Sequence, residues 1–242
     1  MDIPIIFENE DLLVINKPAG VVVNRAESAK GETVQDWIER KFEIRNLKFE
    51  NAEEFKSRRG IVHRLDKDTS GLLVIAKNPA SFEALKNQFK NRETVKKYLA
   101  LVHGKVVPEE GTINAPIERN PFNRKHFGVF AGGREAVTEY KRIMNYALPA
   151  GRQELRIMRG NEDFSFLEVR PLTGRTHQIR VHMKYINHPV VCDPIYGGRK
   201  NYQADKIWCP RLFLHAAYLK ISGHEFSCPL PSDLQSALDR LQ

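Results

Sequence analysis

Residues 60–74 hold the side chains of this chain that are best suited to chemistry. His63, Arg64 and Asp66 stand within four positions of one another. A carboxylate such as Asp66 can attack a sugar anomeric carbon or another electrophile and form a covalent intermediate. An ordinary glycosidase needs a second carboxylate to protonate the leaving group. Asp68 is too close to Asp66 in the sequence to serve as that partner, and we expect it to cap a turn instead.

A turn and a strand are expected to hold Asp66 in place. Residues 68–71 (DTSG) predict a polar turn, in which the Asp68 side chain accepts backbone N–H bonds and Gly71 tolerates a positive φ. Residues 72–76 are all apolar and predict a buried strand. A lone aspartate is more often a turn cap or a surface salt-bridge partner than a nucleophile. These residues alone leave both alternatives open for Asp66.

The composition is that of a globular protein with excess positive charge. The chain has 242 residues, of which 41% are hydrophobic and 28% charged, and its formal net charge is +8. A chain of this length can bury a sizeable core. Positive charge favours polyanions through the release of counterions from phosphates, although it also serves solubility.

Several classes of protein are not indicated. The three cysteines, Cys192, Cys209 and Cys228, are odd in number and far apart, which favours neither a disulfide framework nor a zinc ribbon. We therefore expect a reducing, cytoplasmic location. No signal peptide and no apolar run long enough to span a membrane is apparent, so no membrane partner is expected.

Hydrophobic periodicity and capping signals predict a mixture of strands and helices. The expected strands span residues 3–7, 12–15, 72–76, 94–102, 136–146, 154–159, 164–171 and 212–221. The expected helices span residues 33–42, 79–91, 176–185 and 232–241, with Thr33, Thr176 and Ser232 as N-caps. Residues 43–59 are expected to form a surface excursion with a short helix, and residues 118–135 a long loop. Because no regular βαβ rhythm appears, we predict an α+β fold with a mixed or antiparallel sheet, in one domain over residues 1–242.

The segment 63–73 (HRLDKDTSGLL) resembles the central motif of the RluA-type RNA pseudouridine synthases, which modify uridines of large-subunit ribosomal RNA and transfer RNA. Further matching pieces follow that family's order: residues 17–20 (KPAG), 97–100 (KYLA), 173–180 (TGRTHQIR) and 214–216 (LHA). Together they span nearly the whole chain. The resemblance implies a bent central sheet with helices and loops around a basic cleft. Many relatives carry an additional small RNA-binding module at the N-terminus, for which we expect no room here.

The resemblance assigns Asp66 the role of the essential nucleophile, which attacks either C1′ of the ribose or C6 of the uracil. The glycosidic N1–C1′ bond then breaks, and the base turns and rejoins through C5. Uracil leaves as a resonance-stabilised anion, so one carboxylate suffices. The resemblance implies no cofactor, and no motif for a metal, nucleotide or redox group is found.

The same resemblance assigns roles to four other residues. Arg175 matches the arginine that pairs with the catalytic aspartate, keeping it ionised and aimed. Tyr98 matches the active-site tyrosine, whose ring stacks on the uracil and whose hydroxyl lies near the C5 proton. Arg64 is expected to fill the gap left by a flipped nucleotide or to hold a phosphate, and Leu214 to wall the uracil pocket. The alternatives are a phosphate or surface contact for Arg175 and a plain core position for Tyr98 and Leu214.

Residues 118–135 combine cations with aromatic rings, a composition typical of RNA-contacting loops. The expected RNA contacts there are Arg119, Arg124, Lys125 and Arg134, with Phe122, Phe127 and Phe130 between them. Further candidates elsewhere are Lys17, Arg180, Arg199 and Lys200. The alternative is a solvated basic loop with its phenylalanines packed beneath it.

The sequence thus favours a monomeric enzyme that isomerises uridine in ribosomal or transfer RNA. Two rival hypotheses are a catalytically silent RNA-binding factor and a glycosylase that stops after base release. His63, His177 and His215 are expected to be structural hydrogen-bonding residues rather than acids or metal ligands.

Overall fold

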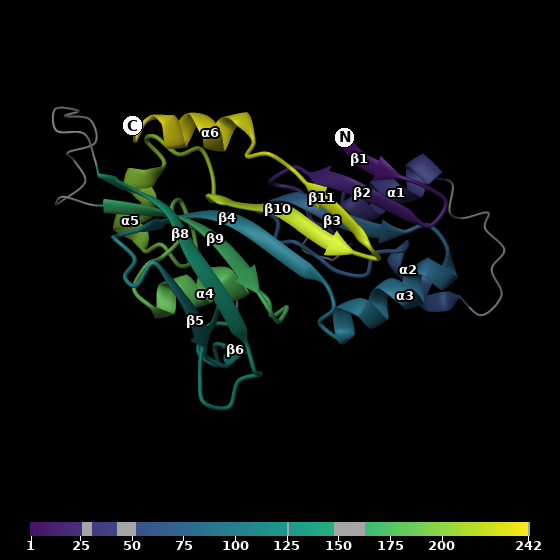
Figure 1. Ribbon diagram of the computed structural model, residues 1–242, viewed down its shortest axis with the longest axis horizontal. Helices are drawn as coiled ribbons and strands as arrows, with labels where there is room; N and C mark the ends of the chain where they lie inside the picture. The colour runs from purple at the N-terminus through teal and green to yellow at the C-terminus, as the bar shows by residue number, and fades with distance from the viewer. Residues whose placement is uncertain (26–30, 43–51, 125, 148–162, 242) are drawn as a thin grey trace. The chain divides into compact units, whose positions relative to one another are not determined.

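The computed structural model describes residues 1–25, 31–42, 52–124, 126–147 and 163–241 (Figure 1). These residues divide into two compact units. Unit 1 comprises Met1–Val95 and Ala216–Cys228, and unit 2 comprises Lys96–His215 and Pro229–Gln242. A single catalytic domain over the whole chain stays a prediction. In the described residues, no helix is both long and apolar enough to cross a membrane.

Unit 1 is built on a sheet with the strand order β1-β2-β3-β10-β11. The strands are β1 (Ile5–Glu8), β2 (Leu12–Lys17), β3 (Ser70–Ala76), β10 (Leu214–Ile221) and β11 (His224–Ser227). The first two residues of β10 belong to unit 2. β2 pairs antiparallel with both β1 and β3, which confirms the predicted N-terminal hairpin. Every residue of β3 is buried, as its continuous apolar run predicts.

Three helices accompany this sheet: α1 (Val34–Phe42), α2 (Glu53–Arg58) and α3 (Pro79–Lys90). The predicted cap of α1 is confirmed, because Thr33 Oγ1 accepts the N–H of Asp36 at 3.2 Å while Asp36 Oδ2 accepts the N–H of Thr33 at 2.9 Å. α3 starts with a similar reciprocal cap between Asn78 and Ser81. Its buried Phe82 meets Phe55 of α2 edge to face.

The sheet of unit 2 has the order β4-β9-β8-β5. Its strands are β4 (Val95–His103), β9 (Asp163–Pro171), β8 (Val137–Ala147) and β5 (Glu110–Asn114), and their pairs are antiparallel. The helices are α4 (Gln178–Tyr185), α5 (Arg199–Asp205) and α6 (Ser232–Asp239). β5, α5 and, in unit 1, β11 were not predicted from the sequence.

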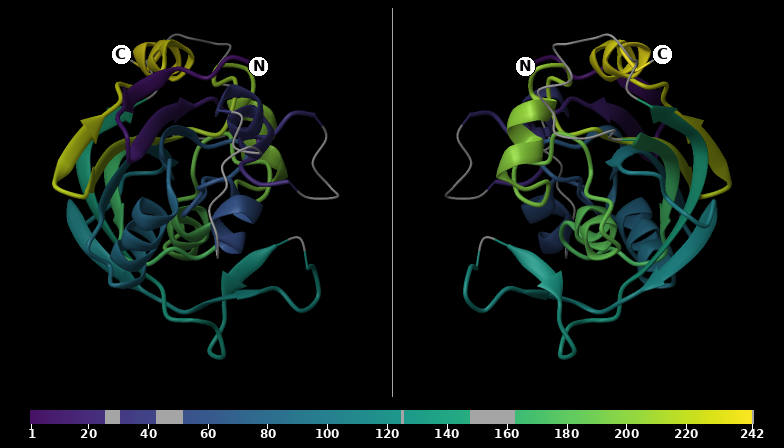
Figure 2. Two further views of the ribbon diagram at one scale, coloured as in Figure 1. Left: turned by 90° about the vertical axis from the view of Figure 1, so that its right-hand side faces the viewer. Right: turned by 90° about the vertical axis from the view of Figure 1, so that its left-hand side faces the viewer.

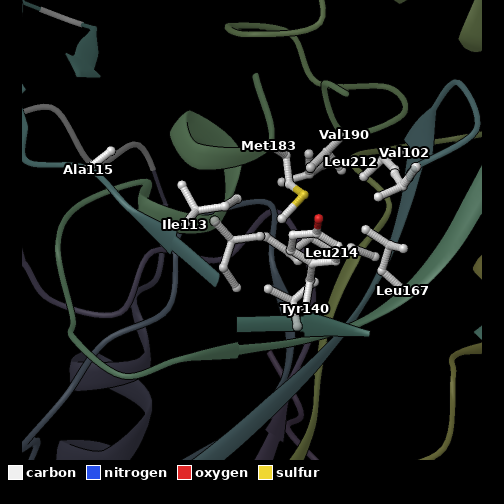
Figure 3. Close-up of a cluster of buried hydrophobic side chains, with 13 residues drawn as sticks. Val102, Ile113, Ala115, Tyr140, Leu167, Met183, Val190, Leu212 and Leu214 are labelled. Carbon is white, nitrogen blue, oxygen red and sulfur yellow. The ribbon is translucent and has the colours of Figure 1, made fainter. Parts of the chain in front are cut away.

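Alternate residues of β4 enter two different cores, as the pleat of a strand requires. Leu101 packs in a cluster with Leu234, Ala237 and Leu238, the predicted apolar face of α6. Ala100 and Val102 belong to a second cluster, which includes Ile179 and Met183 of α4. Figure 3 shows Met183 together with other members of this second cluster.

Residues 118–135 contain a β-hairpin, so the predicted long loop is wrong. β6 (Ile117–Arg119) pairs antiparallel with β7 (Phe127–Val129) as a separate two-stranded sheet. Figure 2 shows this hairpin (teal) projecting from the rest of unit 2. Strands of three residues are too short to show a period of two, which explains why the pattern was missed.

Two predicted N-caps are wrong. The residue before α4 is His177, with a φ of 56°, and its side chain makes no capping bond. α6 begins at Ser232 after Pro231, again without a side-chain cap. The expected strand at residues 154–159 and most of the expected excursion at residues 43–59 lie outside the described residues.

Candidate active site

Asp66 lies in a turn of unit 1 that the main chain fixes on both sides. The N–H of Thr69 donates to the carbonyl of Asp66 at 3.2 Å, and the N–H of Gly20 donates to the carbonyl of Lys67 at 2.8 Å. The side chain of Leu65 is buried. The expected role of Asp68 as turn cap is wrong for the described residues, because a backbone bond closes the turn and no bond to the Asp68 side chain is found. Asp66 itself is half-buried.

Gly71 belongs to β3 rather than to the turn, and its positive φ is as predicted. Its φ is +115°, and a Cβ built on it would lie 2.2 Å from the carbonyl oxygen of Ala216 in β10. The close approach of two backbones therefore requires glycine here. This contact fixes where β3 begins, four residues after the candidate nucleophile.

The expected RNA contact of Lys17 is wrong, because this lysine is fully buried. Its ammonium donates to the carbonyl oxygens of Pro18, Val21 and Lys67 at 2.8, 2.9 and 3.1 Å. Three donors thus meet three carbonyl acceptors, which is the full donor capacity of a lysine. Since Lys67 follows Asp66 directly, Lys17 braces the turn that carries the carboxylate.

Replacing Lys17 with methionine should destabilise the protein by about 3 kcal/mol or more, because the change leaves buried carbonyls without donors. The free energy of unfolding in urea measures this loss. The control is Lys220→Met, which removes an exposed pair with Glu225 and should cost less than about 1 kcal/mol. Equal stabilities of the two variants would contradict the buried role of Lys17.

His63 is structural, as predicted. Its Nε2 accepts the N–H of Val74 at 3.0 Å, and its ring stacks on Phe89 with 4.6 Å between centroids. The accepting nitrogen must be unprotonated, so Nδ1 carries the proton. Arg64, which directly follows His63, is exposed, as an RNA-contacting residue requires.

In unit 2, Tyr98 lies on β4, half-buried, and packs against the second core cluster. Leu214 is a buried member of that cluster (Figure 3). Lys96 precedes Tyr98 by two positions and therefore projects from the same face of the strand. Burial lowers the pKa of Lys96.

Gln178 holds the main chain of Arg175 in a fixed position. The N–H of Arg175 donates to Gln178 Oε1 at 2.9 Å, and the N–H of Gln178 donates back to the carbonyl of Arg175 at 3.1 Å. Oε1 also accepts the hydroxyl of Thr173 at 2.7 Å, and Nε2 donates to Val137 O and Thr138 Oγ1, both at 2.9 Å. The buried amide thus makes all four of its hydrogen bonds. Sequence reasoning missed this positioning role.

The guanidinium of Arg175 is directed by a further contact. Its Nε donates to the carbonyl of Glu135 at 2.8 Å, and the residue is half-buried. A guanidinium carries five donors in a planar fork. One of them is therefore used to set its orientation within unit 2.

The expected RNA contact of Arg180 is also wrong. Arg180 is buried and makes a two-pronged ion pair with Asp193, with N–O distances of 2.7 and 2.8 Å. Its guanidinium lies over the ring of Tyr196. The Tyr196 hydroxyl bonds His177 Nδ1 at 2.9 Å and accepts the N–H of Phe127 at 3.0 Å. Arg180 therefore supports both the start of α4 and the β6–β7 hairpin.

His182 extends the polar network behind Arg175. Its Nε2 donates to Ala115 O at 2.9 Å, and its Nδ1 accepts the hydroxyl of Thr138 at 2.8 Å. Burial lowers the pKa of His182 below its ordinary 6.5, with the bond to Ala115 opposing part of the effect.

Below about pH 6.5, His182 is protonated in the unfolded chain but stays neutral in the folded chain. The free energy of unfolding therefore decreases as the pH is lowered. We expect the free energy of unfolding to drop between pH 7.5 and pH 5.5, and to drop less in His182→Gln, which does not titrate. Urea titrations of both proteins at the two pH values measure the difference. The same drop in both proteins would contradict the assignment.

The basic residues of the hairpin region lie on the surface. Arg119, Arg124 and Arg134 are exposed, while Lys125 lies outside the described residues. Arg199 and Lys200 are exposed on α5. The phenylalanines differ: Phe127 packs edge to face on His177, whereas Phe122 is 95% exposed.

The candidate residues are thus distributed over both units. Unit 1 carries Asp66 and Arg64, and unit 2 carries Tyr98, Arg175 and Leu214. The contacts described for Asp66, Tyr98, Arg175 and Leu214 lie within the unit of each residue, and the joint action of the candidate residues at one uridine stays a prediction. Within the described ranges, no group of three or more His, Cys, Asp or Glu side chains is arranged to hold a metal.

Comparisons with known proteins identify the family. The model for RNA pseudouridylate synthases matches residues 11–185. An uncharacterized RNA pseudouridine synthase of Bacillus subtilis is 38% identical, over 100% of this chain and 74% of its own length. The ribosomal large subunit pseudouridine synthase D of Borreliella burgdorferi is 40% identical, over 90% of this chain and 61% of its own length. The chain therefore spans about three fifths to three quarters of these relatives.

A solved structure agrees with the sequence relatives. Human RNA pseudouridylate synthase domain containing 1 superimposes with a TM-score of 0.72 at 27% identity, covering 98% of this chain and 87% of the human chain. The matched family segment includes the turn of Asp66, the strand of Tyr98 and the start of α4. This chain belongs to the RNA pseudouridylate synthase family.

Proposed function

We propose that the protein converts specific uridines in RNA into pseudouridine, with Asp66 as the nucleophile. The observation that carries the proposal is the turn of Asp66 inside the family match, where backbone bonds and the ammonium of Lys17 hold the carboxylate-bearing segment. A fixed nucleophile loses little entropy on reaching the reactive geometry.

In the proposed reaction, the Asp66 carboxylate attacks C1′ of the ribose or C6 of the uracil. The N1–C1′ bond breaks, the base turns, and a C5–C1′ bond forms. The bond between Asp66 and the substrate carbon breaks, which returns the free carboxylate. The proton on C5 leaves, with the hydroxyl of Tyr98 nearby, and N1 gains a proton, so the product has the mass of the substrate. Arg175 keeps the carboxylate ionised and oriented. Leu214 supplies an apolar wall for the base.

The proposed substrate is ribosomal or transfer RNA in the cytoplasm, bound by a monomer. A target base inside a helix must leave its stack to be reached, and RNA enzymes select such sites largely by shape and unpaired nucleotides. Exposed cations are suited to the phosphates. We assign phosphate binding to the exposed Arg64, Arg119, Arg124 and Arg134 and, outside the described residues, to Lys125.

The test incubates the purified protein with transcribed large-subunit ribosomal RNA and, separately, with a transfer RNA pool. Site-resolved mapping should detect pseudouridine, and chromatography should detect no free uracil. Release of uracil would instead identify a glycosylase. RNA binding without either product would identify a silent RNA-binding factor, and both outcomes would overturn the proposal.

A further inference from the structure

Phe122 is the most exposed large hydrophobic side chain among the described residues, at 95%. It occupies the loop between β6 and β7, in the projecting hairpin of unit 2 (Figure 2). Burial of an aromatic ring is favourable, so a fully exposed phenylalanine forgoes stabilisation. Single exposed apolar residues are common, however, and exposure alone indicates no function. The case for Phe122 depends on how the ring is mounted.

Asn120 fixes the turn that presents the ring. Its Oδ1 accepts the N–H groups of Phe122 and Asn123, at 2.9 and 3.2 Å. Its own N–H donates to the carbonyl of His126 at 2.9 Å across the loop. Pro121 restricts φ immediately before Phe122. The exposed ring therefore stands on a turn with defined hydrogen bonds rather than on a free loop.

The base of the hairpin is anchored in unit 2. Ile117 is buried and exchanges backbone bonds with Arg134, at 2.9 and 3.0 Å. A Cβ on Gly133 would lie 2.8 Å from the backbone of Ile117, so the two segments are in close contact. On the other strand, the N–H of Phe127 donates to the buried Tyr196 at 3.0 Å. Because the base of the hairpin is buried, the hairpin can project from unit 2 and expose Phe122 while staying folded.

Cations flank the ring. Arg119 and Arg124 lie three residues before and two residues after it and are both exposed. The guanidinium of Arg119 lies over the ring of Phe127, and this contact fixes the direction of the Arg119 side chain. Over residues 117–134 the sequence has four basic residues and one acidic residue, Glu118. Positive charge beside an exposed aromatic ring is the combination that binds single-stranded nucleic acid.

We infer that Phe122 stacks on an unpaired base of the RNA while Arg119 and Arg124 bind the neighbouring phosphates. This inference rests on the proposed function and makes it more specific, because the substrate must offer an unpaired nucleotide to the hairpin. A base inside a regular A-form helix presents only its edges, so its face is not available for stacking. The hairpin is thus a docking element for a loop, bulge or single-stranded end.

Tryptophan fluorescence gives a direct test. The only two tryptophans, Trp37 and Trp208, are buried, so Phe122→Trp adds a single exposed indole. A twelve-nucleotide oligouridylate should quench the added emission, whereas an oligomer of the same length made of abasic ribose phosphate should not. The matched control is Val107→Trp, at another exposed position of unit 2, which should respond to neither oligomer. Equal quenching by both oligomers, or by neither, would overturn the inference.

A binding measurement complements the fluorescence. Phe122→Ala should weaken binding of the oligouridylate by about tenfold, and Phe122→Tyr should bind like the unaltered protein. Equal affinities of all three would overturn the inference. Because neither measurement uses catalysis, a protein that stacks RNA on this hairpin but forms no pseudouridine would refute the proposed function alone. A protein that forms pseudouridine without stacking would refute the inference alone.

Discussion

Asp66→Asn is expected to abolish pseudouridine formation, lowering the single-turnover rate by about 10⁴-fold or more. Asparagine keeps the size and shape of aspartate but offers a neutral amide in place of the nucleophilic carboxylate. The proposed covalent or addition step therefore has no attacking group. The measurement is the rate of pseudouridine formation in transcribed ribosomal RNA with the enzyme in excess.

The same variant should fold and bind RNA. Asp66 closes its turn through the main-chain carbonyl, which the substitution leaves in place. We therefore expect the urea midpoint and the affinity for RNA to stay close to those of the unaltered protein. The loss of activity would then result from the missing nucleophile rather than from unfolding.

Asp68→Asn is the matched control, because it removes a half-buried carboxylate two residues away in the same turn. We expect its rate to stay within a few-fold of the unaltered protein. If both variants were equally impaired, the loss would report on the charge of the turn rather than on a nucleophile. If Asp66→Asn kept its rate, Asp66 would not be the nucleophile.

Local patterns were sufficient to predict most of the regular elements. The apolar run of β3, the reciprocal cap of α1 and the apolar face of α6 are encoded in neighbouring residues, and all three are confirmed. The motif around Asp66 was likewise recognisable as a fixed turn before a buried strand. The one wrong prediction in this motif is the cap, because a backbone hydrogen bond, rather than the side chain of Asp68, closes the turn.

The errors among the expected RNA contacts concern charged residues whose partners are distant in the sequence. Lys17 and Arg180 were both interpreted as RNA contacts, because lysine and arginine are rarely buried unless paired. Lys17 finds an acceptor fifty residues away, at Lys67, and Arg180 finds its carboxylate thirteen residues away, at Asp193. Each of these two residues instead supports a segment that holds a candidate catalytic residue. Composition alone cannot distinguish a cation that binds substrate from one that holds the site together.

Arg180→Met tests this distinction and should strongly destabilise the protein. The substitution leaves the fully buried carboxylate of Asp193 without its ion-pair partner. Breaking one side of a buried pair costs about 3–5 kcal/mol. For a protein of this size, the corresponding fall in melting temperature is roughly 10 °C.

The consequences should extend to the reaction. Asp193 also accepts the N–H groups of Ile195 and Tyr196, and Tyr196 bonds His177 at the start of α4. A displaced Tyr196 would loosen the segment that carries Arg175. We therefore expect a lower single-turnover rate in Arg180→Met even at temperatures where it remains folded.

Arg170→Met is the control, since Arg170 makes an exposed pair with Glu139 whose loss should cost less than about 1 kcal/mol. The double variant Arg180→Met/Asp193→Asn should recover part of the stability, because it removes the unpaired charge while the amide oxygen can still accept the N–H groups of Ile195 and Tyr196. A different result would follow if Arg180 bound phosphate: Arg180→Met would unfold like the unaltered protein and bind RNA more weakly. Thermal unfolding and RNA affinity, measured side by side on the three variants, separate a residue that supports Arg175 from one that contacts the substrate.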